Sequence, residues 1–521
     1  MSDYAAAHTY QGVPYGEPMT PTRTVIESLA QQVRVRGDQP VITTASAAGE
    51  QRTMTFADLD RLSARTLGWL RERAGVEPGA VVAIAPANDA TSVLTVLALL
   101  RGGNPTLLLN PTDPDDRVRR QVAAVGATAV LRSAATTFSD GVDLVDPDAI
   151  TDTAGADAAP DPLGDALYIG TSGSTAASKI VAQSYYNAAA NAAGLISHHA
   201  LRPGDRVLGC LPIHHVNGLH FTVFGAIIAG AHVLLADAFR PFGYPRLLDA
   251  FRPRIASVVP SILEALHQTW RSPTPPPGLE YFVSAAAPLT SGTARAVLDR
   301  VGVPVLQGYG LTETTNFSAT MPRGLTPERY RALMVDTDIP SIGVAFPGNE
   351  VAVLGPDGHP VPFGEVGELC MRGHNVMNGY LHNPDATREA FAHGWFHSQD
   401  LGYQVRDEHT GQVFHRITGR SKNIAKVGGT AVSLDEMDRF LRDRAGIRDA
   451  ACVSVPHPML GEEVVVAVVL DHDTAIGAVR DLLGTAFAAE VLPTRVVPLA
   501  AIPRTPTGKV LRPQLAELLA T

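Results

Sequence analysis

Short apolar runs alternate with helix-period segments through the middle of the chain, and this alternation restricts the possible folds more than any other feature. Parallel strands need a long crossover connection, usually a helix, whereas antiparallel strands can be joined by a tight turn. The pattern therefore predicts an α/β fold in which a parallel sheet is covered by helices. The predicted strands are residues 166–169, 232–235, 256–259, 281–284 and 304–306, and the predicted helices are residues 244–251, 262–270 and 289–301.

A second change of pattern divides the chain near its C-terminal end. The 521 residues are too many for one hydrophobic core, so two or more domains are expected. Residues 56–150 show the same strand–helix rhythm, and after Gly419 the pattern restarts as a smaller unit. We predict a large N-terminal domain of residues 1–420, with parallel-type sheets covered by helices, and a small mobile C-terminal α+β domain of residues 421–521.

Charge and apolar content exclude some classes of partner. The formal net charge is −10, which disfavours a nucleic-acid binder because such proteins need a basic surface. The longest apolar stretch, residues 221–236, is broken by Gly225, Gly230 and His232, and predicts a buried helix followed by a strand rather than a membrane span. The first residues do not resemble a signal peptide, and the three cysteines are widely spaced, so we expect a cytoplasmic protein with reduced thiols.

Lysine is rare in this chain. Lysine and arginine together number 42, yet only Lys179, Lys422, Lys426 and Lys509 are lysines. Arginine can provide general surface charge, but it does not replace lysine where a compact, mobile ammonium group is needed. These four positions are therefore the first places to look for chemistry.

The loop at residues 170–179, Gly-Thr-Ser-Gly-Ser-Thr-Ala-Ala-Ser-Lys, directly follows a predicted strand. Glycines let the backbone approach phosphates, hydroxyl and amide groups donate to phosphate oxygens, and a lysine neutralises charge. The loop lacks the ending of a Walker motif, and a plain connection remains the alternative. The candidate phosphate-binding residues are Thr171, Ser172, Gly173, Ser174, Thr175 and Lys179.

A second motif, Gln-Gly-Tyr-Gly-Leu-Thr-Glu at residues 307–313, also follows a predicted strand. Gly308 and Gly310 flank Tyr309 and leave its ring open for stacking. In this motif Thr312 offers a hydroxyl to phosphate, and Glu313 offers a carboxylate to Mg²⁺. The alternative is a turn at a strand end with a core tyrosine.

These two motifs resemble those of the adenylate-forming superfamily, which includes acyl- and aryl-CoA ligases, firefly luciferase and the adenylation domains of peptide synthetases. The resemblance continues in the same order along most of the chain, and it implies the family's two-domain α/β fold. The further matching segments are residues 211–215, 284–289, 395–400, 419–429 and 503–509.

The resemblance implies roles for residues of these segments. Lys509 would be catalytic, together with Thr312 and the Mg²⁺ ligand Glu313. Asp400 and Arg420 would bind the ribose of ATP. Gly308 and Tyr309 would lie beside the adenine, Lys422 would be the hinge, and the substrate pocket would contain His215, Asn217, Ser284, Ala285, Ala286 and Gly310.

Asn217 has two interpretations, since it could bond a ring hydroxyl of a substrate or cap the helix that it begins. Val216 stands where amino-acid-activating relatives carry an aspartate, which disfavours an amino-acid substrate.

Several residues depart from the family pattern. Ala176, Ser178 and Ile180 replace a glycine, a proline and another glycine of the phosphate loop. Gln399 replaces the glycine before the ribose aspartate, and Asn423 replaces an acid that is common in the hinge segment. These changes indicate a divergent branch.

The resemblance implies ATP-dependent adenylation of an aryl or medium acyl acid with release of pyrophosphate, followed by transfer to a thiol. The expected cofactors are ATP and Mg²⁺, with CoA as the expected acceptor. The alternative is a divergent enzyme whose acceptor is a free-standing carrier protein or an amine, or which activates nitrite. A non-catalytic adenylate-binding protein is a further alternative.

Overall fold

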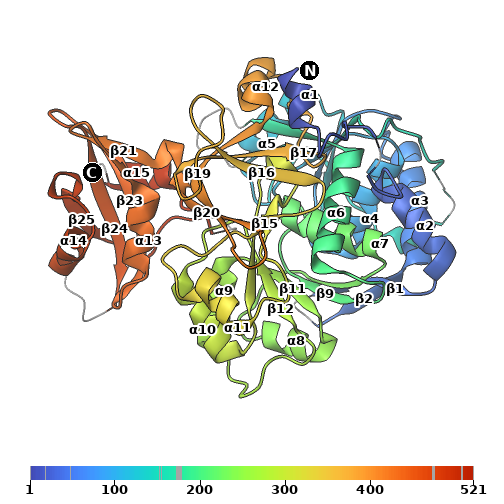
Figure 1. Cartoon of the computed structure of the whole chain (residues 1–521). Coiled ribbons are helices and arrows are strands. Elements are labelled where there is room, and N and C mark those ends of the chain that lie inside the picture. The colour runs from blue at the N-terminus through green and yellow to red at the C-terminus, as the bar shows by residue number, and fades with distance from the viewer. Residues whose placement is uncertain are drawn as a thin grey trace.

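The computed structural model describes residues 2–17, 19–46, 49–151, 153, 155–171, 179–471, 476–505 and 508–519. Within these residues the chain forms three sheets in a large domain and a fourth in a small C-terminal domain, which lies at one side of the large domain (Figure 1). The predicted α/β class, with a large and a small domain, is confirmed.

The largest sheet is mostly parallel. In spatial order, all strands from β13 (Val305–Tyr309) to β1 (Pro40–Ala45) run parallel to their neighbours. Antiparallel strands are added at both edges. Its strands, in spatial order, are β15 (Val344–Ala345), β14 (Ala319–Thr320), β13 (Val305–Tyr309), β12 (Tyr281–Ser284), β11 (Ile255–Val258), β9 (Arg206–Gly209), β10 (His232–Ala236), β1 (Pro40–Ala45) and β2 (Gln51–Thr55).

The second sheet has a parallel part with an antiparallel edge. In spatial order, all strands from β7 (Asp165–Gly170) to β6 (Val142–Asp143) run parallel to their neighbours. Beyond β7, the strands β8 and β18 continue the sheet in antiparallel pairs. The strands, in spatial order, are β18 (Gly379–Tyr380), β8 (Ile180–Ser184), β7 (Asp165–Gly170), β4 (Thr106–Leu108), β3 (Val82–Ala85), β5 (Ala129–Arg132) and β6 (Val142–Asp143).

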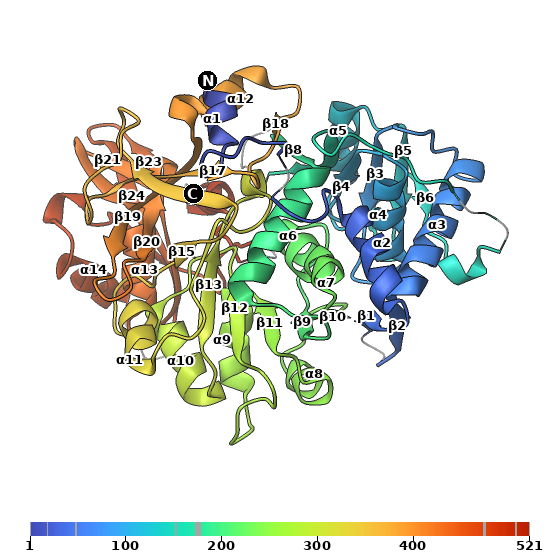
Figure 2. The same ribbon diagram turned by 45° about the vertical axis from the view of Figure 1, so that its right-hand side comes forward.

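A layer of helices between these two sheets forms the main core (Figure 2). This layer contains α2 (Val25–Arg36), α3 (Phe56–Glu72), α4 (Ala90–Arg101), α6 (Tyr185–His199), the π-helix η2 (Asn217–Phe224) and α7 (Gly225–Ala229). The chain moves one way along the sheet from β9 to β10 and the opposite way from β10 through β11 and β12 to β13. Because the crossovers between parallel strands are right-handed, this reversal places the helices after β10 on the other face of the sheet. These helices are α8 (Tyr244–Phe251), α9 (Pro260–Thr269) and α10 (Ser291–Val301).

The remaining helices of the large domain are short or peripheral. α5 (Asp115–Val125) packs its apolar side on β3 and β4, and α1 (Asp3–Ala7) contacts β17 (Gly367–Gly373). The others are η1 (Pro147–Ala149), η3 (Thr312–Thr314), α11 (Pro327–Tyr330), η4 (Arg331–Val335), α12 (Pro384–Ala390) and η5 (Ala392–Gly394).

The third sheet of the large domain is entirely antiparallel. It was not predicted, since the sequence indicated only parallel-type sheets for this domain. Antiparallel strands need no helical crossover, although the connection from β17 to β19 contains β18, α12 and η5. The strands of this sheet are β16 (Asn349–Leu354), β17 (Gly367–Gly373), β19 (Phe396–Arg406) and β20 (Val413–Arg420). The last of these strands ends where the chain passes through η6 (Ser421–Asn423) into the small domain.

The small domain packs helices on both faces of one sheet. Alternate residues of β24 belong to two separate apolar clusters, Val464, Val466 and Val468 to one and Val465, Ala467 and Val469 to the other, as the period of a strand requires. The sheet contains β22 (Thr430–Ser433), β21 (Ile424–Val427), β24 (Gly461–Leu470), β23 (Ile447–His457) and β25 (Arg495–Pro498). The helices are α13 (Leu434–Arg442), α14 (Ile476–Gly484), η7 (Ala489–Val491) and α15 (Arg512–Leu519).

The elements predicted from periodicity are present with small shifts at their ends. The predicted helix 244–251 has the bounds of α8, and the apolar stretch 221–236 forms the second half of η2, then α7 and β10. No helix in the described part of the chain is both long and apolar enough to cross a membrane.

Candidate active site

The loop that carries Lys509 reaches from the small domain to the large one. Gly508 has a φ of +87°, and a Cβ built on it would lie 3.6 Å from Ser261 Oγ and 3.8 Å from the Ala287 Cβ. Ser261 lies at the start of α9, just after β11, and Ala287 follows β12, so the loop touches the segments that leave the carboxyl ends of two strands of the largest sheet. The carboxyl ends of parallel strands are where open α/β sheets bind ligands.

The loop is held by bonds within the small domain. Arg504 donates to the Gly508 carbonyl over 2.7 Å and to both carboxylate oxygens of Asp449 over 2.6 and 3.0 Å. The Thr505 N–H donates to the Lys509 carbonyl over 2.8 Å. The Lys509 side chain is therefore presented on an anchored hairpin.

Charges of the large domain act on Lys509. Although solvent reaches this side chain, the surrounding protein desolvates it and lowers its pKa, and the Arg420 cation lowers the pKa further. Asp400 and Glu313 act in the opposite direction, so both carboxylates lie within electrostatic range of the ammonium group. The Lys509 charge also acts on His215, whose pKa is lowered to about 4 by burial first and then by this charge.

Asp400, Tyr309 and Arg420 form one cluster. The Tyr309 hydroxyl donates to Asp400 Oδ2 over 2.7 Å, and Arg420 Nε donates to Asp400 Oδ1. Asp400 is the neighbour of Arg420 in the β19–β20 ladder, so strand pairing brings the two charges together. Asp400 raises the pKa of Arg420, and burial raises the pKa of Tyr309 well above its usual value.

Glu313 and Lys179 meet at a residue that the sequence did not single out. The Tyr380 hydroxyl donates to Glu313 Oε1 over 3.0 Å, and Lys179 Nζ lies 4.6 Å from the centre of the Tyr380 ring. Tyr380 pairs with Val181 in the β18–β8 ladder, directly after the phosphate loop. Thr312, in η3, precedes Glu313, and its carbonyl accepts a bond from Gln183 Nε2 over 2.7 Å.

The ends of the phosphate loop are joined, since the Thr171 N–H donates to the Lys179 carbonyl over 2.9 Å. The other predicted phosphate-binding residues lie outside the described part of the chain, and so do two of the departures noted above. These residues are Ser172, Gly173, Ser174 and Thr175, together with Ala176 and Ser178.

Asn217 does not cap the helix that it begins, which corrects one of its two interpretations. Its Oδ1 atom instead accepts a 2.8 Å bond from Ser257 Oγ on β11, because the side chain turns toward the largest sheet. Its Nδ2 atom is buried without a partner among the described residues, as are His215 Nε2 and Ser284 Oγ. Polar atoms in this state can bond a substrate.

Two other residues of the predicted pocket have conformational constraints. A Cβ on Gly310 would lie 1.8 Å from the Asn316 carbonyl oxygen, so only glycine fits this close approach of two chain segments. Ala286 has a φ of +71°, a conformation that favours glycine, and it follows the buried Ala285 at the end of β12.

The fold and these clusters can be compared with known proteins. The family described as AMP-binding enzyme matches residues 29–381, and its C-terminal domain matches residues 436–509. The chain belongs to the AMP-binding enzyme family. The expected membership of the adenylate-forming superfamily is thereby confirmed, and so is its class, an ATP-dependent, AMP-forming acid–CoA ligase.

Relatives of this AMP-binding enzyme include several CoA ligases. A sulfoacetate–CoA ligase of Cupriavidus necator is 35% identical over 68% of this chain and 67% of its own length. A feruloyl-CoA synthase of an Amycolatopsis species is 29% identical over 88% of this chain and 92% of its own. ATP-bound MatB from Rhodopseudomonas palustris superimposes with a TM-score of 0.79 at 26% identity, covering 95% of this chain and 99% of that one.

Gln399 departs from the family pattern at a position that needs glycine-like geometry. It has a φ of +62°, and its N–H donates to Glu368 Oε1 over 2.7 Å where the β17–β19 register shifts. Left-handed backbone costs a residue with a Cβ about 1–2 kcal/mol. This AMP-binding enzyme therefore carries strain immediately before Asp400.

We expect Gln399→Gly to stabilise the protein, since glycine adopts this φ without strain. Glycine also loses more entropy on folding, so the net gain should be about 0.5–1 kcal/mol. The matched control is Gln404→Gly on the same strand, which should destabilise because it sits in a regular ladder opposite His415. Thermal unfolding midpoints of the two variants should move in opposite directions, and a lower midpoint for Gln399→Gly would contradict the strain.

A second cluster of possible metal ligands lies on β17 and β19. Among the described residues, Glu368, Cys370 and His397 alone form a group of three such side chains within 4.8 Å of one another. His397 Nδ1 lies 2.8 Å from Glu368 Oε2, and this bond raises the pKa of His397. A thiol and an imidazole are unsuited to Mg²⁺, so the group does not compete with Glu313 for that ion.

Proposed function

We propose that this enzyme adenylates a small carboxylic acid at the junction of its two domains and then transfers the acyl group to CoA. The observation that supports this most is the position of Lys509, a small-domain lysine within range of Asp400, Glu313 and Arg420. An ammonium group there can neutralise charge as a carboxylate approaches the α-phosphate of ATP.

We assign the nucleotide to the clusters around Tyr309 and Lys179. Asp400 would accept bonds from both ribose hydroxyls, with Arg420 keeping its carboxylate in place. Tyr309 would lie beside the adenine, next to Gly308. The phosphate loop from Thr171 to Lys179 would hold the leaving phosphates, and Tyr380 would orient Glu313.

The site fits one Mg²⁺ ion. This ion is usually bound by one or two carboxylates together with phosphate oxygens and water, and Glu313 offers a partly accessible carboxylate beside Lys179. When bound, the ion would neutralise phosphate charge. The protein would position Glu313 through the hydroxyl of Tyr380 and the fold of η3.

The first step needs little covalent work from the protein. The substrate carboxylate attacks the α-phosphorus, a P–O bond forms, and pyrophosphate leaves with the electrons of the broken P–O bond. Positioning and charge neutralisation carry such a transfer. Lys509 would hold the attacking oxygen and an α-phosphate oxygen together, with Thr312 donating its hydroxyl to the phosphate.

The acid would bind between η2 and the ends of β12 and β13. Buried polar atoms without partners cost about 1–3 kcal/mol each, so a substrate that bonds them is favoured. Asn217 Nδ2, His215 Nε2 and Ser284 Oγ therefore favour an acid with a second polar group, such as a ring hydroxyl or a second anion. The relatives named for sulfoacetate and feruloyl-CoA are compatible with either kind.

For the second step we assign the hinge to Lys422 and the domain boundary to the end of β20 at Arg420. A turn of the small domain about Lys422 would remove Lys509 from the site and admit the thiol. The altered phosphate loop is the reason to test nitrite and acceptors other than CoA alongside the acids and CoA. The cytoplasmic location stays a prediction.

The substrate can be identified by measuring pyrophosphate release from ATP–Mg²⁺ with sulfoacetate, ferulate, hexanoate and nitrite in turn. We expect release with an acid that carries a second polar group, and weak release with hexanoate. Asn217→Leu, which removes the buried amide, should lower release with the polar acid about tenfold and should leave hexanoate unaffected. Release confined to hexanoate would contradict the polar pocket, and release confined to nitrite would favour the alternative.

A further inference from the structure

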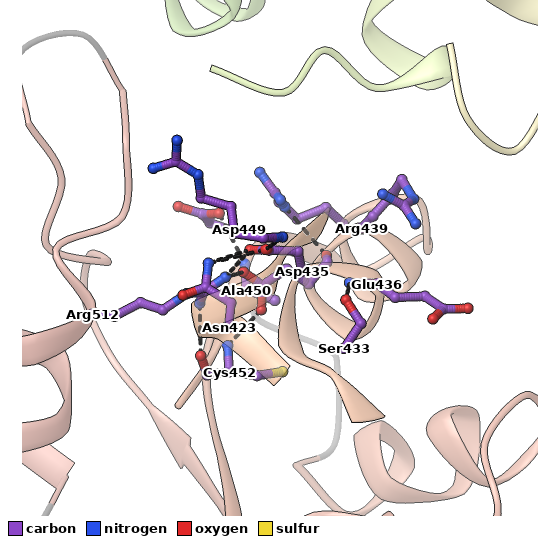
Figure 3. A network of polar contacts seen from close by, with 12 residues as sticks. Asn423, Ser433, Asp435, Glu436, Arg439, Asp449, Ala450, Cys452 and Arg512 are labelled. Carbon is purple, nitrogen blue, oxygen red and sulfur yellow. Dashed lines mark hydrogen bonds and ion pairs between the residues drawn. The ribbon is translucent and has the colours of Figure 1, made fainter. Parts of the chain in front are cut away.

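Asp435 joins a compact polar network at the start of α13 (Figure 3). Its carboxylate accepts bonds from the Arg420 N–H over 2.9 Å, from Asn423 Nδ2 over 3.0 and 3.1 Å, and from Arg512. The first two donors lie on either side of Lys422, and Arg512 begins α15. One side chain therefore links the large domain, the hinge segment and the small domain.

Within the small domain, Asp435 is held rigidly. Arg512 donates to Asp438 over 2.9 Å and to the Cys452 carbonyl over 2.7 Å, and it also pairs with Asp435. Asp438 is 2% exposed and accepts a bond from the Cys452 N–H over 2.5 Å. Arg512 thus ties α13, β23 and α15 together and fixes the direction of the Asp435 carboxylate.

The contact with the large domain depends on how the two domains are oriented. Arg420 is the last residue of β20, before the hinge, whereas Asp435 comes after it. A Cβ on Gly419 would lie 2.7 Å from Ser433 Oγ and 3.2 Å from Asp435 Oδ2, so glycine permits this close approach. A turn about Lys422 would separate the Arg420 N–H from Asp435.

The contacts of Asn423 explain why an amide stands here in place of the usual acid of the hinge segment. Its amide donates to both oxygens of Asp435 over 3.0 and 3.1 Å. An acid at this position would place two carboxylates in contact, and they would repel. Asn423 and Asp435 therefore act as a pair.

We propose that Asp435 is a positioning residue that holds the small domain in the orientation in which Lys509 reaches the active site. This inference rests on the proposed two-step function, in which the small domain turns about Lys422. The carboxylate bonds to a main-chain N–H of the large domain and is itself fixed by Arg512. Bonds to charged groups are strong enough to shift an equilibrium between two orientations about tenfold or more.

The orientation can be measured without substrate. A Cβ on Gly292 of α10 would lie 3.5 Å from Asp443 Oδ1, just after α13, so Gly292→Cys with Asp443→Cys places two thiols across the domain junction. The three native cysteines are buried. In the full chain carrying this pair, the rate of disulfide formation reports the fraction of molecules in the observed orientation.

We expect Asp435→Ala to slow this crosslinking severalfold or more. The control is Glu436→Ala, which removes the neighbouring first-turn carboxylate, whose side chain points away from the network (Figure 3). This control should crosslink at the original rate. Equal rates for the two variants would overturn the proposal. The crosslink needs neither ATP nor an acid, so failure of the proposed function would leave this result unchanged.

A charge exchange keeps the test valid if Asp435→Ala folds poorly. Asn423→Asp should slow crosslinking because it puts a carboxylate against Asp435. Adding Asp435→Asn should recover part of this loss, since it removes the repulsion between the two carboxylates while the bonds of residue 435 to the Arg420 N–H and to Arg512 are weakened. An unaffected Asn423→Asp variant, or no recovery in the double variant, would contradict the pairing.

Discussion

Replacing Lys509 by alanine is expected to lower ATP-dependent pyrophosphate release about 10²–10³-fold. The lysine lies within range of Asp400 and Glu313, where it would neutralise charge that develops during the transfer. Nucleotide affinity should change little, because the proposed ribose contacts stay in place. Stopped-flow measurement of pyrophosphate release, together with titration of ATP, separates these two quantities.

Lys426→Ala is the matched control, since it removes another of the four lysines from the same domain. Its side chain is exposed on β21, and without CoA its pyrophosphate release should equal that of the unmodified enzyme. Lys509 is active as the protonated ammonium group, so pyrophosphate release should fall as the pH rises and this group loses its proton. Because the pKa of Lys509 is lowered, this fall should come at a pH below 10.5, the value of a free lysine. Equal rates for Lys509→Ala and Lys426→Ala would contradict the role of Lys509.

Asp400→Ala should raise the Kd for ATP by about 100-fold or more and also destabilise the protein. Two bonds from ribose hydroxyls to a carboxylate would be lost, and charged hydrogen bonds contribute about 1.5–3 kcal/mol each. Arg420 and the Tyr309 hydroxyl would lose their partner as well. Calorimetric titration of ATP and thermal unfolding of the same samples report the two effects.

Asp407→Ala is the matched control for Asp400→Ala, because both aspartates are buried and pair with an arginine. The Asp407 side chain is 2% exposed and pairs with Arg329, whereas that of Asp400 is 8% exposed and pairs with Arg420. Asp407→Ala should therefore reduce stability in a comparable way while ATP affinity stays unchanged. If both variants lost ATP affinity to the same extent, the effect of Asp400 would be general destabilisation rather than ribose binding.

Local periodicity was sufficient to predict most of the central fold. The strands and helices from β7 to β13 repeat at short distances along the chain, so their pattern is encoded in neighbouring residues. The antiparallel sheet of β16, β17, β19 and β20 was missed, because strand partners joined by long or irregular connections leave a weaker signal.

The candidate site was predictable where a residue belongs to a motif. Asp400 and Tyr309 were named separately, and the structure brings them within one hydrogen bond. Tyr380 was missed because it follows Glu313 by 67 residues, a separation that no local spacing encodes. The bond between Asn217 and Ser257 was likewise unpredictable, since it crosses from a helix to a strand.

The most direct test of the account is pyrophosphate release from ATP–Mg²⁺ and the best acid of the panel, measured with and without CoA. We expect a slow release without CoA that becomes strongly faster with CoA, with formation of an acyl-CoA thioester. Both activities should be lost in Lys509→Ala. Release that is insensitive to CoA, with no thioester formed, would contradict the central claim and favour another acceptor.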